Sequence, residues 1–310
     1  MKIGIISSVT GVRADIDQIV QSVVKIEKEG FDHYWFVHLP NIGYDAMQIA
    51  GVVGQHTSRI ELGTAVVPTY PRHPFVMAQQ ALTTQVITGG RFTLGIGPSH
   101  NFVIEDMLGM EYDRPGKHTR EYLTILQDLI QRGKSDFKGE FYRVDTKLLV
   151  IRAEPLSVMM AALGPVMLKV AGELTDGTIT WMTGPKTMET HVVPKISAAA
   201  QAAGRPQPRV AMSLPVIVTN DKSAGRERVN ELLVDYGNIQ NYRRMLDIEG
   251  ANLPGDVALV GNAAEVEAQL RRYADMGVTD YCALILPEEG GGGESIARTQ
   301  AVLQDLIGKI

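Results

Sequence analysis

The chain has 310 residues, a formal net charge of −5 and a sequence pI near 5.8. This balance argues against the basic surface that nucleic-acid binding or a polybasic membrane contact needs. The length lies in the range that α/β barrels fill as one unit, and 45% apolar residues provide a sizeable core. We therefore expect one domain over residues 1–310.

Cysteine content and the N-terminus point to an ordinary reducing compartment. The lone cysteine, Cys282, cannot form an internal disulfide, and its place in the apolar run 281–286 predicts a core position. The N-terminus starts directly with a strand pattern and shows no signal-type segment. No apolar run approaches the 18 or so residues of a membrane span, so we expect a cytoplasmic protein.

The first half of the chain alternates short apolar runs with stretches of helical spacing. Residues 3–6 predict a strand, and residues 15–29 predict a helix that Gly30 ends. The next predicted elements are, in chain order, a strand over 34–37, a helix over 45–56, a strand over 60–67, a helix over 73–88 and a strand over 92–96.

A longer segment, about residues 98–157, follows the fourth strand and is expected to be an insertion. It contains a predicted helix over 117–131 and a small hairpin around Gly139. The alternation then resumes. The remaining elements are strands over 158–162, 178–181, 209–219 and 281–286, and helices over 165–174, from 182 to about 203, and over 224–236, 242–249, 263–276 and 295–307.

Eight strands, each followed by helical sequence, predict a parallel sheet. Eight such units favour a closed (β/α)₈ TIM barrel, and an open Rossmann-like sheet is the alternative. In a barrel, function lies just after each strand. The positions to inspect are therefore Ser7, Ser8 and Thr10, then His38, then residues 64–74, 97–101, 163–164, 181–184, 215–219 and 288–293.

These strand ends lack the residues of several common chemistries. There is no HExxH motif, no cysteine pair and no cluster of carboxylates and histidines, so no metal site is expected. A lysine for a Schiff base and a GxSxG elbow are also absent. The remaining residues are small, uncharged and rich in glycine, which suits a flat ligand whose phosphate is held by backbone amides.

Two glycine motifs have alternative interpretations. Gly95 and Gly97 resemble the start of a dinucleotide fingerprint, but the third glycine is missing, so a strand end that a ligand approaches closely is the better interpretation. Gly164 precedes Pro165 at a predicted helix start, where free amides would suit a phosphate. An ordinary tight turn is an equally good interpretation of Gly164.

Two histidines, His38 and His100, fall just past strand ends. Histidine suits proton transfer near neutral pH, so either is a candidate acid or base, or else a ligand contact or structural residue. Arg72 and His73 lie between two prolines. They would face the mouth of the site or cap the next helix, and we favour the mouth.

The segments 63–74 (GTAVVPTYPRHP) and 88–97 (TGGRFTLGIG) resemble the bacterial luciferase-like monooxygenase superfamily. Gly30-Phe31-Asp32 before the second strand agrees with this resemblance, as do the segments 161–164 and 171–177, so that it covers nearly the whole chain. Within the superfamily, the chain is most similar to the branch that uses the deazaflavin coenzyme F420, which includes methylenetetrahydromethanopterin reductase.

The resemblance implies that F420 lies across the strand ends, with its ring over a bulge after the third strand. A non-prolyl cis peptide is implied there, at Thr64–Ala65 or else at Ala65–Val66. Phosphate would be held near Gly164 and by residues 181–184. The implied coenzyme contacts are Thr64, Ala65, Val66, Gly97, Ser99, Ala162, Leu163, Gly164, Trp181, Met182, Thr183 and Gly184.

The expected reaction is hydride transfer between F420 and a small organic substrate, with His100 or His38 handling a proton. Ser7, Tyr70 and Arg72 are candidate substrate contacts, and a homodimer is implied. His100 stands where dehydrogenase relatives carry a glutamate, and Val37 replaces the acid of an acid–histidine pair. The resemblance therefore does not imply the substrate of those relatives for this chain. The alternatives are an FMN-dependent monooxygenase that uses reduced flavin and oxygen, and a flavin-binding barrel without turnover.

Overall fold

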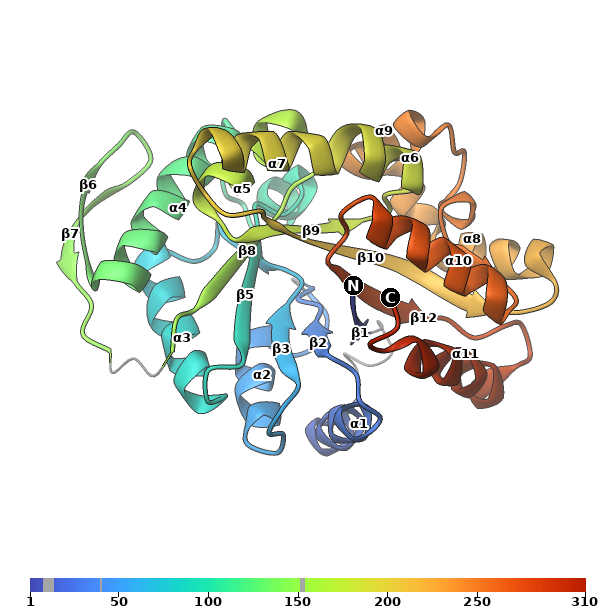
Figure 1. The fold of residues 1–310 in the computed structure, drawn as a ribbon. Coiled ribbons are helices and arrows are strands. Elements are labelled where there is room, and N and C mark those ends of the chain that lie inside the picture. The colour runs from blue at the N-terminus through green and yellow to red at the C-terminus, as the bar shows by residue number, and fades with distance from the viewer. Residues whose placement is uncertain (8–13, 40, 151–153) are drawn as a thin grey trace.

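The computed structural model describes residues 1–7, 14–39, 41–150 and 154–310; Ser8 and Thr10 lie outside these ranges. Within them, eight parallel strands close into a barrel, with β12 pairing back to β1 (Figure 1). The predicted TIM barrel is confirmed, and the open sheet is wrong. The barrel strands are, in order, β1 (Lys2–Ile6), β2 (His33–Phe36), β3 (Glu61–Thr64), β5 (Phe92–Gly97), β8 (Ser157–Ala161), β9 (Gly177–Trp181), β10 (Arg209–Val218) and β12 (Asp280–Ile285).

An outer layer of helices covers the barrel, and local signals set their ends. An Asp15–Gln18 capping box starts the first helix, and Pro165 occupies the first position of α5. Cys282 is buried in the core, as predicted. The outer helices are α1 (Ile16–Lys28), α2 (Ala46–Gly54), α3 (Pro74–Ile87), α4 (Pro115–Arg132), α5 (Pro165–Leu174), α7 (Val193–Ala202), α10 (Ala263–Asp275) and α11 (Gly292–Leu306).

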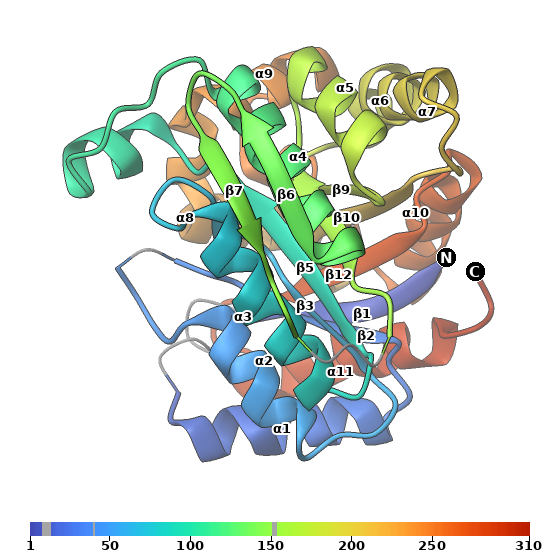
Figure 2. The same cartoon turned by 90° about the vertical axis from the view of Figure 1, so that its left-hand side faces the viewer.

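The expected insertion after the fourth barrel strand contains one regular barrel helix. Helix α4 packs between α3 and α5, so it fills the position of the fourth helix. The additions are a π-helical turn (Val103–Met107) and the hairpin of β6 (Lys134–Lys138) and β7 (Arg143–Lys147). Figure 2 shows this hairpin on the outside of the barrel.

A second addition follows β10. Helices α8 (Lys222–Asn238) and α9 (Gln240–Glu249) precede β11 (Leu259–Gly261), which pairs with the end of β10. Both helices were expected, but β11 was not, because three residues carry too little pattern. Helix α9 packs against α6 (Pro185–Thr187), at the C-terminal side of β9. No helix among the described residues is long and apolar enough to cross a membrane.

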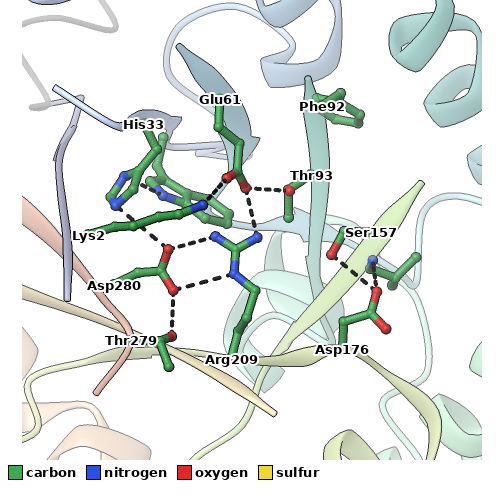
Figure 3. Close-up of polar contacts among 12 residues, drawn as sticks. Lys2, His33, Glu61, Phe92, Thr93, Ser157, Asp176, Arg209, Thr279 and Asp280 are labelled. Carbon is green, nitrogen blue, oxygen red and sulfur yellow. Dashed lines mark hydrogen bonds and ion pairs between the residues drawn. The ribbon is translucent and has the colours of Figure 1, made fainter. Parts of the chain in front are cut away.

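The N-terminal end of the barrel is filled by an ionic network (Figure 3). Arg209, at the start of β10, reaches Glu61 of β3 at 2.8 Å and Asp280 of β12 at 2.6 Å. Thr93 donates to Glu61 at 2.6 Å, and Lys2 lies 3.4 Å from the same carboxylate. Because Arg209 links strands on opposite sides of the barrel, this network closes the N-terminal end. We call these residues, together with His33, the floor of the barrel.

Candidate active site

The C-terminal end of the barrel carries an irregularity between β3 and the short strand β4 (Val67–Pro68). Gly63 pairs with Thr93 and Val67 with Ile96, so three residues on this side face two on β5. An extra residue bends a strand and redirects its side chains. The bulge expected after the third strand is present, and it divides the predicted strand 60–67 in two.

The peptide bond between Ala65 and Val66 is cis. The position that we preferred, Thr64–Ala65, is therefore wrong by one residue, and the second position is correct. The Ala65 N–H still donates to the Phe36 carbonyl at 2.8 Å. The regular ladder between β2 and β3 thus extends through Ala65, and the backbone departs from it only afterwards.

The Thr64 side chain fastens this bulge to β5. Its buried hydroxyl accepts from the Gly95 N–H at 3.0 Å and donates to the Gly95 carbonyl at 2.8 Å. A Cβ at position 95 would lie 1.8 Å from the Thr64 carbonyl oxygen, which explains the glycine. Thr64 therefore shapes the surface formed by Ala65 and Val66, while its hydroxyl is already used within the protein.

The end of β5 packs tightly against the bulge and then turns sharply. A Cβ on Gly97 would lie 2.8 Å from Val66 Cγ2 and 3.2 Å from the Ala161 Cβ. Ser99 has a left-handed φ of 67°, and its carbonyl accepts from the Tyr112 hydroxyl at 3.2 Å. Left-handed backbone is uncommon in residues other than glycine and concentrates at functional sites.

The end of β8 is an open helix start. Gly164 is the N-cap residue of α5, and it provides no side-chain cap. A Cβ added there would meet no described atom within 4 Å. Ala162 is buried beneath it, and the Leu163 carbonyl lies 2.7 Å from His191 Nε2. The first amides of α5 are therefore approachable by an anion.

The end of β9 resembles the end of β8, because a Gly-Pro pair starts a helix there too, but the free amides of this helix already have a partner within the protein. Met182 is buried with a left-handed φ of 58°, and the Thr183 hydroxyl bonds to Thr180 at 2.9 Å. The amides of Lys186 and Thr187, which follow Gly184, donate to the Glu249 carboxylate at 3.1 and 2.7 Å. A carboxylate thus fills the helix start where a phosphate was expected, so of the two expected phosphate positions only Gly164 is open.

An aromatic series joins the ends of β5 and β9. Trp181 meets Tyr236 edge-on, Tyr236 meets Tyr242, and Tyr242 meets His100, each with ring centroids 5.5 Å apart. His100 also stacks on Phe102 at 5.6 Å. The Trp181 indole Nε1 is buried and has no hydrogen-bond partner among the described residues. The predicted residues Trp181 and His100 are therefore parts of one wall, completed by α8 and α9.

A polar cluster lies after β2. His38 Nδ1 accepts from the Ala46 N–H at 3.3 Å, and Asp45 caps α2 and pairs with Arg72. Burial lowers the pKa of His38, and the neighbouring Arg72 lowers it further, while Asp45 opposes the shift. Burial also lowers the pKa of His100. For both imidazoles, burial therefore favours the neutral form.

The other candidate substrate contacts have structural partners. The Ser7 hydroxyl accepts from the Val37 N–H at 2.9 Å, beside His38. The Tyr70 ring stacks on His118 at 3.9 Å, and its hydroxyl donates to the Asp113 carbonyl at 3.3 Å. His73 caps α3 through the Phe75 N–H, so the cap alternative is correct for His73. Among the described residues, no group of three or more His, Cys, Asp or Glu could hold a metal ion.

Sequence reasoning missed Glu249, Tyr236 and Tyr242. Each lies far along the chain from the strand-end residue or helix start that it contacts. The helical spacing of their segments was recognised, but the sequence did not show that these helices pack at the ends of β5 and β9. Asp45 carried a usable signal, because an aspartate directly before an apolar helical stretch is a typical N-cap.

Comparison with known proteins identifies the family. Residues 1–280 match the family model described as luciferase-like monooxygenase, so the chain belongs to this family, and the expected enzyme class is confirmed. The chain is 26% identical over 268 residues to 5,10-methylenetetrahydromethanopterin reductase from Methanolobus tindarius, covering 83% of this chain and 81% of the relative.

Two solved structures share the fold. One is an F420-dependent secondary alcohol dehydrogenase in complex with an F420–acetone adduct, with a TM-score of 0.77, 20% identity and 97% of each chain covered. The other is the oxygenating constituent of 3,6-diketocamphane monooxygenase from Pseudomonas putida in complex with FMN, with a TM-score of 0.76 and 16% identity. That match covers 100% of this chain and 97% of the other.

Proposed function

We propose that the protein is an F420-dependent oxidoreductase that transfers a hydride between the deazaflavin ring and a small organic substrate. The observation that carries this proposal is the bulge formed by Ala65 and Val66, packed against Gly97 at the C-terminal end of the barrel. It provides a neutral surface of small side chains for a flat ring. The similarity to the F420-dependent glucose-6-phosphate dehydrogenase of Amycolatopsis mediterranei and to the F420-dependent secondary alcohol dehydrogenase supports this coenzyme.

The residues present fit such a coenzyme. The open amides after Gly164 would hold its phosphate, with no carboxylate in the way. The unpartnered Trp181 Nε1 donor would meet a polar atom of the coenzyme or substrate. When bound, F420 supplies or accepts the hydride. The protein would orient the two reactants and exclude water, and His100 would exchange a proton with the substrate.

An FMN-dependent monooxygenase is the second candidate, because the fold matches an FMN complex equally well. Titration decides between them. The chain has two tryptophans, Trp35 in the core and Trp181 in the proposed site, so coenzyme binding should quench Trp181 fluorescence. We expect F420 to quench the wild type at micromolar concentration and the Trp181→Phe variant hardly at all. Tight FMN binding without any response to F420 would overturn the proposal.

Turnover is tested next. Reduced and oxidised F420 are offered with panels of carbonyl, imine, enone and alcohol compounds, and the deazaflavin absorbance is followed. Hydride exchange with any of them excludes a binding protein without turnover. If F420 binds and no compound of these four classes reacts, the non-catalytic alternative is preferred.

We also propose a homodimer that forms through α2 and α3. Large apolar side chains on these helices are exposed: Val52 on α2, and Val76, Val86 and Ile87 on α3. A second copy would bury them. Light scattering should give twice the chain mass of 33.9 kDa, and Val86→Glu should shift it toward the monomer. A monomeric wild type would reject this proposal.

A further inference from the structure

The hydrogen bond at His38 fixes which ring nitrogen carries the proton. Ala46 is the first residue of α2, so its N–H has no partner within the helix, and it donates to His38 Nδ1 at 3.3 Å. A backbone amide can only donate. Nδ1 must therefore be the unprotonated nitrogen, and the single proton of the neutral ring lies on Nε2.

The surroundings oppose a second proton. An imidazolium would turn its Nδ1–H toward the Ala46 N–H, so that two donors face each other at the positive end of the α2 dipole. The charged groups that face His38 are Arg72, from the segment before α3, and Asp45, from the start of α2. These two pair with each other, so the Asp45 charge is already compensated.

The other ring nitrogen remains available. His38 is half-buried, yet Nε2 is not one of the buried side-chain atoms without a partner, and no hydrogen bond to it is found among the described residues. Nε2 therefore reaches solvent. His38 directly follows β2, beside Ser7 and the bulge, at the end of the barrel where a substrate is expected.

We propose that His38 acts as a fixed neutral hydrogen-bond donor, whose Nε2–H binds a substrate oxygen, and not as an acid or base. This proposal rests on the proposed function and narrows it to substrates with a carbonyl group, or with a hydroxyl group in the reverse direction. A helix N-terminus that keeps a histidine neutral so that it polarises a carbonyl is a known catalytic arrangement.

Bound F420 would supply the hydride to the carbonyl carbon, and the π electrons of the C=O bond would move onto the oxygen that faces the His38 Nε2–H. The Nε2–H would stabilise this oxygen, which would take a proton that His100 relays from water. His38 does not give up its own proton, because that would leave an imidazolate.

The first test needs no coenzyme. Nitrogen-15 NMR of the ligand-free protein, with the His38→Gln spectrum to assign the signals, reports the protonation of each ring nitrogen. We expect unprotonated Nδ1 and protonated Nε2 at about pH 8, and uptake of the second proton at a lower pH than in an ordinary histidine, whose pKa is about 6.5. A protonated Nδ1 at about pH 8, or a second proton taken up at or above the pH of an ordinary histidine, would overturn the proposal.

The second test uses two variants that carry the same amide group on side chains of different length. In His38→Gln the amide nitrogen lies near the former Nε2 position and can still donate to the substrate. In His38→Asn the amide can still accept from Ala46 but cannot reach that far. We expect ketone reduction to fall less than about tenfold in the first and on the order of a hundredfold in the second. Equal losses in both would argue for proton transfer and against the proposal.

The outcomes separate this inference from the proposed function. If F420 does not bind, the proposed function fails, while the NMR result still decides whether His38 is a fixed donor. If F420 binds and only imines or enones react, the carbonyl assignment is wrong although the coenzyme is correct. Circular dichroism and F420 affinity, unchanged in both variants, would show that the substitutions act on substrate and not on folding.

Discussion

The two ends of the barrel differ in their polar groups and in how these are paired. The N-terminal end is closed by charges that satisfy one another, with Arg209 between Glu61 and Asp280 (Figure 3). The C-terminal end is lined by glycines, small side chains and aromatic rings, and it contains an open helix start and a buried donor without a partner. The difference teaches that buried, paired charges mark the structural end of this barrel, whereas small side chains and an open helix start mark the end proposed to bind the coenzyme.

The largest effect is expected at the N-terminal end. Arg209→Met leaves the almost fully buried Asp280 without its cation and Glu61 with only the exposed Lys2, and it should lower the free energy of unfolding by about 3–5 kcal/mol. Urea denaturation measures this loss. Lys2→Met is the matched control, because Lys2 faces the same Glu61 carboxylate from an exposed position, and it should cost at most about 1 kcal/mol.

F420 affinity tests whether the two ends of the barrel are independent. The Kd for F420 should stay unchanged in Arg209→Met at temperatures where the variant is folded, since the ionic network lies at the end away from the proposed coenzyme. Similar losses of stability in both variants would mean that the floor is not held by the buried charges. A loss of affinity would mean that the two ends are coupled.

Part of the pH dependence of the free energy of unfolding should come from His33, which lies at the N-terminal end of the barrel. Burial lowers the pKa of His33 in the folded protein, so the unfolded chain takes up a proton first as the pH falls. Stability is then full above the unfolded pKa of about 6.5 and declines below it by about 1.4 kcal/mol per pH unit. His33→Asn keeps an acceptor for the Trp35 indole and should make this decline shallower. The part that remains comes from His38, His100 and His118, whose pKa values burial also lowers.

A second decline is expected at lower pH. Burial alone would raise the pKa of Asp280, but the Arg209 guanidinium outweighs it and the pKa is lowered. The stabilisation is present above the unfolded pKa of about 4 and is lost as the pH falls through the folded value. Denaturation at a series of pH values separates the two declines. A His33→Asn curve parallel to the wild type between about pH 6.5 and 5 would contradict the role of His33.

At the C-terminal end, Gly164→Ala should weaken F420 without affecting the fold. The added Cβ meets no described atom, and the φ of −77° is accessible to alanine, so the free energy of unfolding should change by less than about 0.5 kcal/mol. The methyl group would stand over the amides that are proposed to bind phosphate, so the Kd for F420 should rise about tenfold, or about 1.4 kcal/mol. An unchanged Kd would place the phosphate elsewhere.

Sequence alone predicted most of the barrel, because strand period, helix spacing and Gly or Pro stops act locally. Helix α5 was predicted at its observed bounds, since Pro165 marks its first position. The cis peptide was misplaced by one residue, because only the ladder to Phe36 shows where regular pairing ends. The carboxylate at Gly184 was not predictable, because Glu249 lies 62 residues beyond Thr187 and, in the sequence, resembles any other glutamate in a helical stretch.

The smallest effect on coenzyme affinity is expected from Glu249→Gln, and it tests whether two similar turns have different roles. Gly164 and Gly184 both precede a proline that starts a helix, but only the second helix is capped by a carboxylate. The substitution removes the charge and one acceptor, and it should cost about 1 kcal/mol of stability. If phosphate binds only at Gly164, the Kd for F420 should change less than about twofold, whereas a coenzyme phosphate near Gly184 would bind appreciably tighter once the negative charge is removed.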